Sequence, residues 1–100
     1  MEGTFSMYID DFIWLPDVVE EIAVKHHITD EEAEEFFFNR PHYRFVEYGH
    51  EKVEDVYSAS GQTDAGRYLI VFFIYKSENT ALNLSARDMD KKERRRYEQR

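Results

Sequence analysis

Residues 66–75, with the sequence Gly-Arg-Tyr-Leu-Ile-Val-Phe-Phe-Ile-Tyr, constrain the fold of this chain more than any other segment. Both alternating sets of positions are apolar, and most of the side chains are β-branched or aromatic, as in a strand that is covered on both faces. A helix of this composition would be apolar all round, and the run is short before it meets the polar turn at residues 76–79. We therefore predict that this segment is the central strand of a small sheet.

Further segments have the period-two pattern of strands, at residues 43–48, 53–60 and 81–86. They are separated from one another and from the central strand by turns at residues 49–51, 61–66 and 77–79. Loops this short connect only antiparallel neighbours, because a parallel crossover needs a dozen residues or more. The sequence thus predicts a small antiparallel sheet, a four-stranded meander to which part of residues 5–14 adds an N-terminal edge strand.

The last strand of the meander has two sets of alternating side chains. We expect one set to point away from the other, and the sets are Leu82, Leu84 and Ala86 against Asn83, Ser85 and Arg87. Arg87 should therefore leave the sheet on its more polar side or at its end.

Two helices are predicted before the meander. Pro16 suits a first helical turn, where no amide hydrogen is needed, and a helix-spaced apolar set follows it up to a terminus at residues 25–27. Thr29 and Glu32 have the spacing of a capping box that opens the second helix, which ends before Pro41. The expected buried stripe of this second helix is Ala33, Phe36 and Phe37.

A short third helix is predicted at residues 90–97, where Asp90 and Glu93 repeat the spacing of a capping box. The predicted order of elements is β-α-α-β-β-β-β-α, which is an α+β fold. A chain of 100 residues is long enough for one core but not two, so we expect a single domain over residues 1–100.

The composition limits the possible chemistry. The chain has no cysteine, which excludes disulfides, thiolate metal sites and a cysteine nucleophile. Its four histidines lack the spacing of metal ligands, and no signature of a cofactor site is present, so we expect neither a metal nor a cofactor. No segment resembles a membrane span or a secretory leader, so we expect a cytoplasmic protein without membrane contact.

The charge is unevenly distributed along the chain. Its formal net charge is −8, but residues 87–100 hold seven Lys/Arg and four Asp/Glu, whereas residues 1–86 hold six and 17. A uniformly acidic domain would repel nucleic acid, yet one basic end can still hold phosphate, because salt screens charges more than about 8–10 Å apart. The candidate nucleic-acid-binding residues of this end are Lys91, Lys92, Arg94 and Arg95. Alternatively, basic residues in a last helical turn only complement the helix dipole.

Other candidates each have a structural alternative. Arg67 begins the central strand and offers paired donors to a phosphate, but strand-end arginines often only pair with exposed carboxylates. His26 could move a proton near neutral pH, although a histidine at a helix C-terminus is equally suited to the helix dipole. His27 stands where a helix often ends in a left-handed residue.

Taken together, several motifs resemble those of the BrnT family of bacterial toxins, over about residues 12–97. They are the Trp14 segment, residues 25–29 leading into 32–36, residues 61–63 with 66–69, and residues 85–87 with 93–97. The family's usual glycine after the Lys-His pair is replaced here by His27. The resemblance implies a RelE-like fold and a ribonuclease toxin, encoded beside a BrnA-like antitoxin that neutralises it and binds operator DNA.

The resemblance also implies the site. Its substrate would be RNA, free or on the ribosome, whose 2′-hydroxyl attacks the adjacent phosphorus. Arg87 and Arg67 would stabilise the charge on the phosphoryl oxygens, and Glu93 would hold Arg87 in place. His26 would carry the proton with Lys25 as its helper. The catalytic residues implied are therefore Lys25, His26, Arg67, Arg87, Glu93 and Tyr97.

Two other functions are compatible with this sequence. A catalytically inactive RelE-like scaffold would keep the fold and bind a protein partner, for which the acidic surface of the first two helices suits a basic antitoxin. A purely structural domain without a partner is the third alternative.

Overall fold

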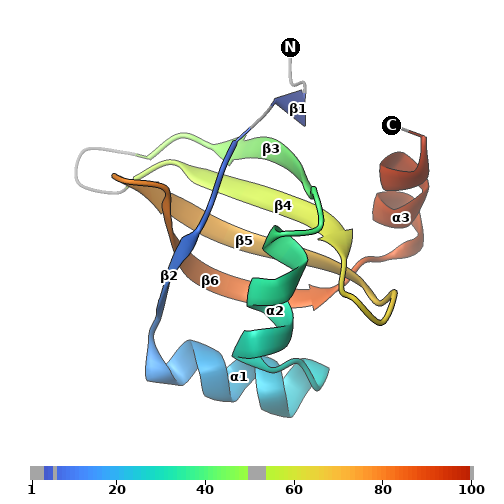
Figure 1. Cartoon of the computed structure of the whole chain (residues 1–100), viewed down its shortest axis with the longest axis horizontal. Coiled ribbons are helices and arrows are strands. Elements are labelled where there is room, and N and C mark those ends of the chain that lie inside the picture. Colours follow the sequence, from blue (N-terminus) through green and yellow to red (C-terminus); the bar gives the residue numbers. More distant parts are fainter. Residues whose placement is uncertain (1–3, 6, 50–53, 100) are drawn as a thin grey trace.

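The computed structural model describes residues 4–5, 7–49 and 54–99, and it shows an α+β fold (Figure 1). The strands are β1 (Thr4–Phe5), β2 (Asp11–Trp14), β3 (His42–Glu47), β4 (Val56–Gln62), β5 (Tyr68–Lys76) and β6 (Thr80–Asp88). The helices are α1 (Pro16–His26), α2 (Asp30–Phe37) and α3 (Lys91–Glu98). The predicted fold class and central strand are confirmed. Residues 50 and 51 of a predicted turn, and residue 53 at the start of a predicted strand, lie outside the described residues.

All six strands belong to one mixed sheet with the order β1-β3-β4-β5-β6-β2. Strands β3 to β6 form the predicted antiparallel meander. The predicted N-terminal edge strand is β2, but it runs parallel to its neighbour β6, with Phe12 opposite Ala81. A parallel pair is possible here because the two strands are far apart in the sequence and need no short connection.

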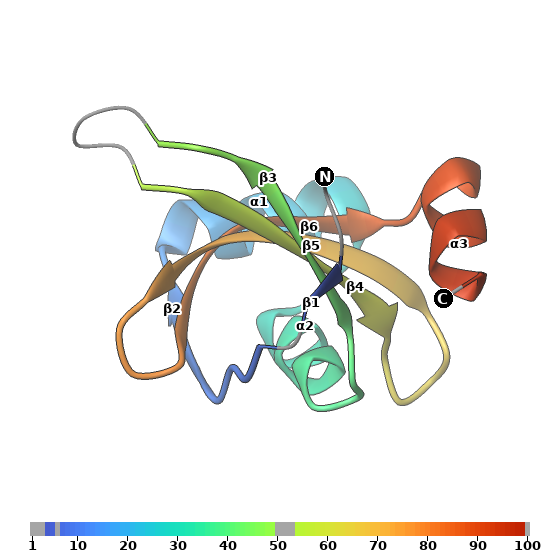
Figure 2. The same cartoon turned by 90° about the horizontal axis from the view of Figure 1, so that it is seen from above.

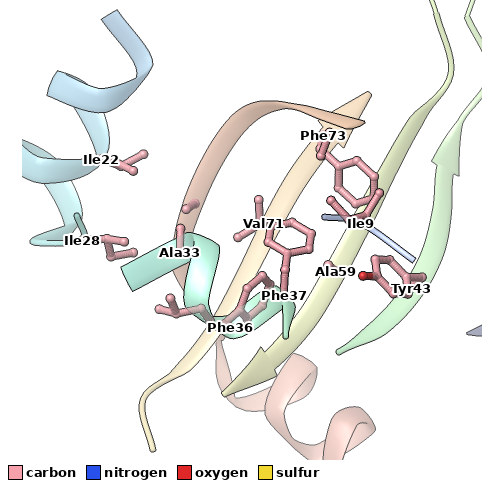
Figure 3. Close-up of a cluster of buried hydrophobic side chains, with 13 residues drawn as sticks. Ile9, Ile22, Ile28, Ala33, Phe36, Phe37, Tyr43, Ala59, Val71 and Phe73 are labelled. Atoms are coloured by element: carbon pink, nitrogen blue, oxygen red, sulfur yellow. The ribbon is translucent and has the colours of Figure 1, made fainter. Parts of the chain in front are cut away.

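The core lies between one face of the sheet and α2, and α1 adds Ile22 to it from the β6 edge (Figures 1 and 3). Leu69, Val71 and Phe73 project from β5 on this face and are fully buried. The predicted stripe of α2 packs on them, with the ring of Phe37 5.8 Å from that of Phe73. Burying each such large side chain stabilises the fold by roughly 1.5–3 kcal/mol. We call this side of the sheet the helix face.

The opposite side of the sheet, which we call the open face, carries the other set of β5 side chains, namely Tyr68, Ile70, Phe72 and Ile74. Figure 2 shows α2 on one side of the sheet and α3 apart from it, at the end of the strands. No helix in the described part of the chain is long and apolar enough to cross a membrane.

A β-bulge in β6 corrects the predicted alternation of that strand. Phe72 pairs with Ser85 and Phe73 with Asn83, so Leu84 has no partner on β5. The extra residue shifts the alternation by one position. As a result Asn83 lies on the helix face with Ala86, and Leu82 lies on the open face, so the predicted grouping is wrong for Asn83 and Leu82. Ala86 points away from Arg87, as predicted. Ser85 and Arg87 share the open face, as predicted.

Candidate active site

Helix α3 is fixed against the open face at both of its ends. At its N-terminus the predicted capping box is present: Asp90 accepts from the Glu93 amide at 2.7 Å, and Glu93 accepts from the Asp90 amide at 2.9 Å. At the other end Tyr97 is only 6% exposed, and its ring centroid lies 5.4 Å from that of His42 and 6.0 Å from that of Tyr68. The buried tyrosine therefore docks α3 on β3 and β5.

Arg87 connects β6 to α3 through a forked ion pair. Both terminal nitrogens of its guanidinium donate to the Glu93 carboxylate at 2.8 Å, and Nη1 also donates to the Asp88 carbonyl at 3.2 Å. The guanidinium carbon lies 5.6 Å from the centre of the Phe72 ring. Glu93 thus orients Arg87 while it also caps the helix.

The strand pairing aligns polar side chains across the open face. One row runs over four strands as His42, Ser60, Ile70 and Arg87, and the next row as Arg44, Ser58, Phe72 and Ser85. Paired residues on adjacent strands point to the same face, and neighbouring strands lie about 4.8 Å apart. His42 and Arg87 therefore stand at opposite ends of a row about 14 Å long.

A pocket of about 360 Å³ lies over these rows, between the sheet and α3. That volume is within the range of small-ligand sites. Its polar lining residues are His42, Arg44, Ser58, Ser60, Glu93, Arg96 and Tyr97. Arg87 borders the pocket through Glu93 and Phe72, so cationic side chains from a strand on each side and from α3 gather around it.

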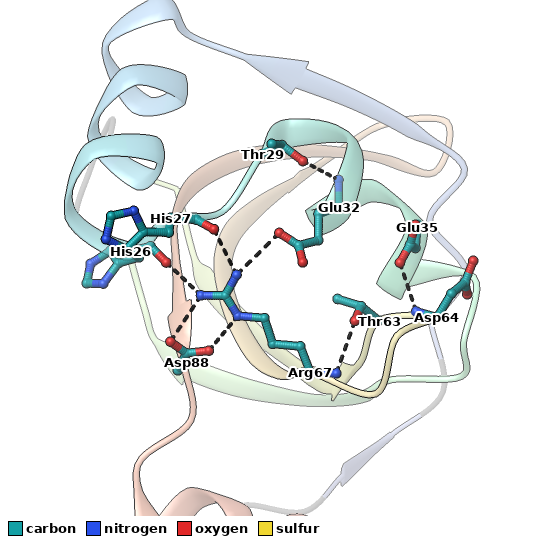
Figure 4. A network of polar contacts seen from close by, with 9 residues as sticks. All are labelled: His26, His27, Thr29, Glu32, Glu35, Thr63, Asp64, Arg67 and Asp88. Atoms are coloured by element: carbon teal, nitrogen blue, oxygen red, sulfur yellow. Dashed lines mark hydrogen bonds and ion pairs between the residues drawn. The ribbon is translucent and has the colours of Figure 1, made fainter.

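Arg67 occupies a different environment, at the corner between α1 and α2 (Figure 4). It donates to the carbonyls of His26 at 2.6 Å and His27 at 2.8 Å, which end α1. It also holds both oxygens of Asp88 at 2.8 and 3.1 Å, and the Glu32 carboxylate at 3.4 Å. Each of its five N–H groups thus has an acceptor. We call Arg67 and these acceptors the Arg67 clamp.

The local backbone explains why the Arg67 clamp is needed. His27 has φ 55° and ψ 42°, the left-handed residue expected at the end of α1, and the last carbonyls of a helix need donors from elsewhere. Thr29 accepts from the Glu32 amide at 3.0 Å, as a helix cap should. The second bond of the predicted capping box is not made within the described residues, because the Glu32 carboxylate turns to Arg67.

Both arginines shift the pKa of their carboxylate partners in the same direction. The hydrogen bonds from Arg67 lower the pKa of Asp88, and those from Arg87 lower the pKa of Glu93. The same hydrogen bonds raise the pKa of each arginine. All four groups are therefore charged at neutral pH, and neither carboxylate is prepared to act as a general acid.

The structure divides the predicted catalytic residues into two groups. Arg87, Glu93 and Tyr97 come together at the pocket, whereas the other three lie at the α1–α2 corner. There Lys25 is exposed and pairs with Glu21 at 2.9 Å, and His26 contributes a carbonyl to the Arg67 clamp. The division follows from alternation, because Arg87 and Asp88 are adjacent on β6 and point to opposite faces.

The predicted RNA-binding residues lie on α3. The guanidinium of Arg94 stacks 3.8 Å from the centre of the Tyr68 ring and also pairs with Glu98 at 3.4 Å. The remaining three are exposed, namely Lys91, Lys92 and Arg95.

The prediction missed the three basic side chains that line the pocket, His42, Arg44 and Arg96. A signal for two of them was present, because His42 and Arg44 flank the apolar Tyr43 and alternation sends them to the opposite face. Tyr43 is 3% exposed and belongs to the core. Within the described residues, no group of three His, Asp or Glu side chains is arranged to hold a metal ion.

Comparison with models of known protein families gives a match. The family model described as the ribonuclease toxin BrnT of type II toxin-antitoxin systems matches residues 14–93. The matched region contains the Arg67 clamp, strands β3 to β6 and the Arg87–Glu93 pair. No protein with a curated description matches the chain.

Proposed function

The chain belongs to the BrnT family, the ribonuclease toxins of type II toxin-antitoxin systems, and we propose that it cleaves RNA in the pocket on its open face. The observation that carries the proposal is the oriented Arg87 at the rim of this pocket. Its fork to Glu93 fixes the guanidinium before any substrate arrives. Preorganised donors of this kind are what a developing phosphorane charge requires.

In the proposed reaction the RNA 2′-hydroxyl attacks the neighbouring phosphorus and the bond to the 5′-oxygen breaks. The products are a 2′,3′-cyclic phosphate and a free 5′-hydroxyl. Arg87 stabilises the charge on the phosphoryl oxygens. Among the described residues, acceptors occupy three of its five N–H groups, so two can reach a substrate.

The proton must leave the 2′-hydroxyl and reach the departing 5′-oxygen. We assign this transfer to His42, because its imidazole lines the pocket and imidazole exchanges protons near neutral pH. Tyr97 lies beside it and can donate through its hydroxyl. In this proposal Lys25, His26 and Arg67 support the fold instead of the phosphate.

The same proposal extends to the partners. A family of toxin-antitoxin systems implies an antitoxin. We propose that it is BrnA-like, that operator DNA is bound only through it, and that the single toxin domain acts in the cytoplasm on RNA, free or on the ribosome. The exposed basic residues of α3 would follow the RNA backbone beyond the pocket, which reduces repulsion from the net charge of −8.

The test is primer extension on cellular RNA after induction of the chain in a bacterial host. Arg87→Ala is compared with a control, Lys76→Ala. Lys76 is a cation on β5 that points to the same open face as Arg87 but lies at the opposite end of the strands. We expect new RNA ends and growth arrest with the wild type and Lys76→Ala, and neither with Arg87→Ala. Unchanged RNA with abundant, folded wild-type protein would favour the inactive scaffold instead.

A second pair of variants separates the two histidines. If His42 carries the proton, His42→Ala should lose cleavage while His26→Ala keeps it. The reverse result would return the proton transfer to the α1–α2 corner.

A further inference from the structure

An apolar row crosses the open face beside the pocket. Strand pairing places Ile13 opposite Leu82, Leu82 opposite Ile74, and Ile74 opposite Val56. These four aliphatic side chains therefore form a line across β2, β6, β5 and β4, about 14 Å long at the usual strand spacing. We call it the apolar row.

The apolar row is accessible to a partner. Ile13 is 41% exposed, and the other three members are half-buried although neighbouring strands flank them. Helix α2 packs on the opposite face, α1 lies along the β6 edge of the sheet, and α3 lies at the pocket (Figures 1 and 2). Among the described elements nothing seals the row, whereas isolated exposed apolar residues such as Val24 on α1 are ordinary for a protein surface.

The row is continuous with the pocket. Ile74 and the pocket residue Phe72 are alternate residues of β5 on one face, and Val56 and the pocket residue Ser58 are alternate residues of β4. The pocket therefore begins two residues along the strands from the row, about 7 Å away. A segment bound along the row can reach the pocket with its next side chains. Such a segment would block RNA without touching the helix face.

The charges indicate the chemistry of the occupant. Cationic Arg44 and Arg96 line the pocket and Arg87 borders it, whereas the rest of the chain is strongly acidic. A partner that carries carboxylates is attracted to this one end of the molecule and repelled from the acidic helices. A cationic pocket beside an apolar row is complementary to an amphipathic segment that carries both acidic and apolar side chains.

Resting on the proposed function of the pocket, we propose that the antitoxin neutralises the chain by docking on this face. Apolar side chains of one antitoxin segment cover the apolar row, and acidic side chains of the same segment enter the pocket in place of RNA phosphate. The surface of α1 and α2, which the sequence offered for a basic antitoxin, is not the inhibitory contact.

The test uses the purified chain and the antitoxin whose gene adjoins it. Ile13→Glu places a charge in the row at its most exposed position, and Val24→Glu makes the same change on α1, where the side chain is 70% exposed. We expect Ile13→Glu to lower the affinity for the antitoxin by about tenfold or more, as for a central interface residue. Val24→Glu should bind the antitoxin as tightly as the wild type does. Weakening by Val24→Glu alone would overturn the proposal.

Two further measurements keep the outcome clear. Hydrogen exchange on the wild-type complex needs no substitution; we expect slower exchange in β2 and β6, and protection confined to α1 and α2 would contradict the docking. RNA cleavage by Ile13→Glu without antitoxin should equal that of the wild type. If the wild type itself cleaves no RNA, the proposed function fails, while the binding comparison still decides the docking site.

Discussion

Two arginines, Arg67 just before β5 and Arg87 on the neighbouring β6, show how the same side chain serves different ends. Arg67 is enclosed by five acceptors, two of them backbone carbonyls, and ties α1, α2 and β6 together. Arg87 is held by one carboxylate and one carbonyl at the rim of a pocket. A guanidinium whose N–H groups all bond to acceptors of the fold has a structural role. One that is oriented but keeps N–H groups without an acceptor can bind a ligand.

The largest expected effect of the difference is on catalysis. Arg87→Ala should lower RNA cleavage by about 10²–10³-fold, as for the loss of one preorganised charge-stabilising donor. The thermal midpoint should change little, because the side chain is 36% exposed and Glu93 remains as the helix cap. Single-turnover cleavage of a short RNA, with circular dichroism as the folding control, measures both. Equal cleavage by the folded variant would remove Arg87 from the site.

Arg67→Ala should lower the stability of the fold and leave RNA cleavage largely unchanged. The carbonyls of His26 and His27 and the Asp88 carboxylate lose their donors, so the free energy of unfolding should fall by about 2–3 kcal/mol. Cleavage per folded molecule should be retained at a temperature where the variant is fully folded. Urea unfolding together with activity of the folded fraction checks this. A folded but inactive variant would restore Arg67 to the catalytic role that the family resemblance implies.

Local patterns predict most of this fold. The apolar alternation of residues 66–75 and the short turns fix the meander, and cap spacing places α2 and α3. The parallel pairing of β2 and the bulge at Leu84 were not predictable, because both depend on contacts between distant strands. The bulge matters most locally, since it alone moves Asn83 to the helix face.

The site was predictable only in part for a related reason. Arg87, Glu93 and Tyr97 are close in sequence and meet through one turn and one helix. His42 is far from them along the chain, and only the register from β3 through β6 aligns it with Arg87. Conversely, Lys25, His26 and Arg67 were predicted to be catalytic because a sequence shows which side chains can donate hydrogen bonds. It does not show which acceptors the folded chain brings to them.

The carboxylate partners of the two arginines, Glu93 and Asp88, make the stability of the fold depend on pH. The arginines hold the pKa of Glu93 and of Asp88 below their ordinary values, so both pairs stabilise the fold above those values. This stabilisation is lost as the pH falls through the lowered pKa of each folded carboxylate. Glu93 is 17% exposed and Asp88 58%, so solvent screens the second pair more.

We therefore expect the free energy of unfolding to fall as the pH drops below about 4, the usual range of carboxylates. Glu93→Gln should flatten this dependence by about 1 kcal/mol, and Asp88→Asn should flatten it less. Urea unfolding of the wild type and both variants at neutral and acidic pH makes the comparison. If Asp88→Asn has the larger effect, the Arg67 clamp is the less solvated of the two pairs.

The smallest expected effect concerns the residue that shapes the corner. His27 adopts φ 55°, a left-handed conformation that disfavours most side chains but not glycine. His27→Gly should therefore raise the free energy of unfolding by about 0.5–1 kcal/mol, since the carbonyl that Arg67 binds is retained. His26→Gly, one residue earlier inside α1, should lower it by a similar amount. If His27→Gly is destabilising instead, the imidazole itself makes a contact that outweighs the backbone preference, and the corner is held by more than the Arg67 clamp.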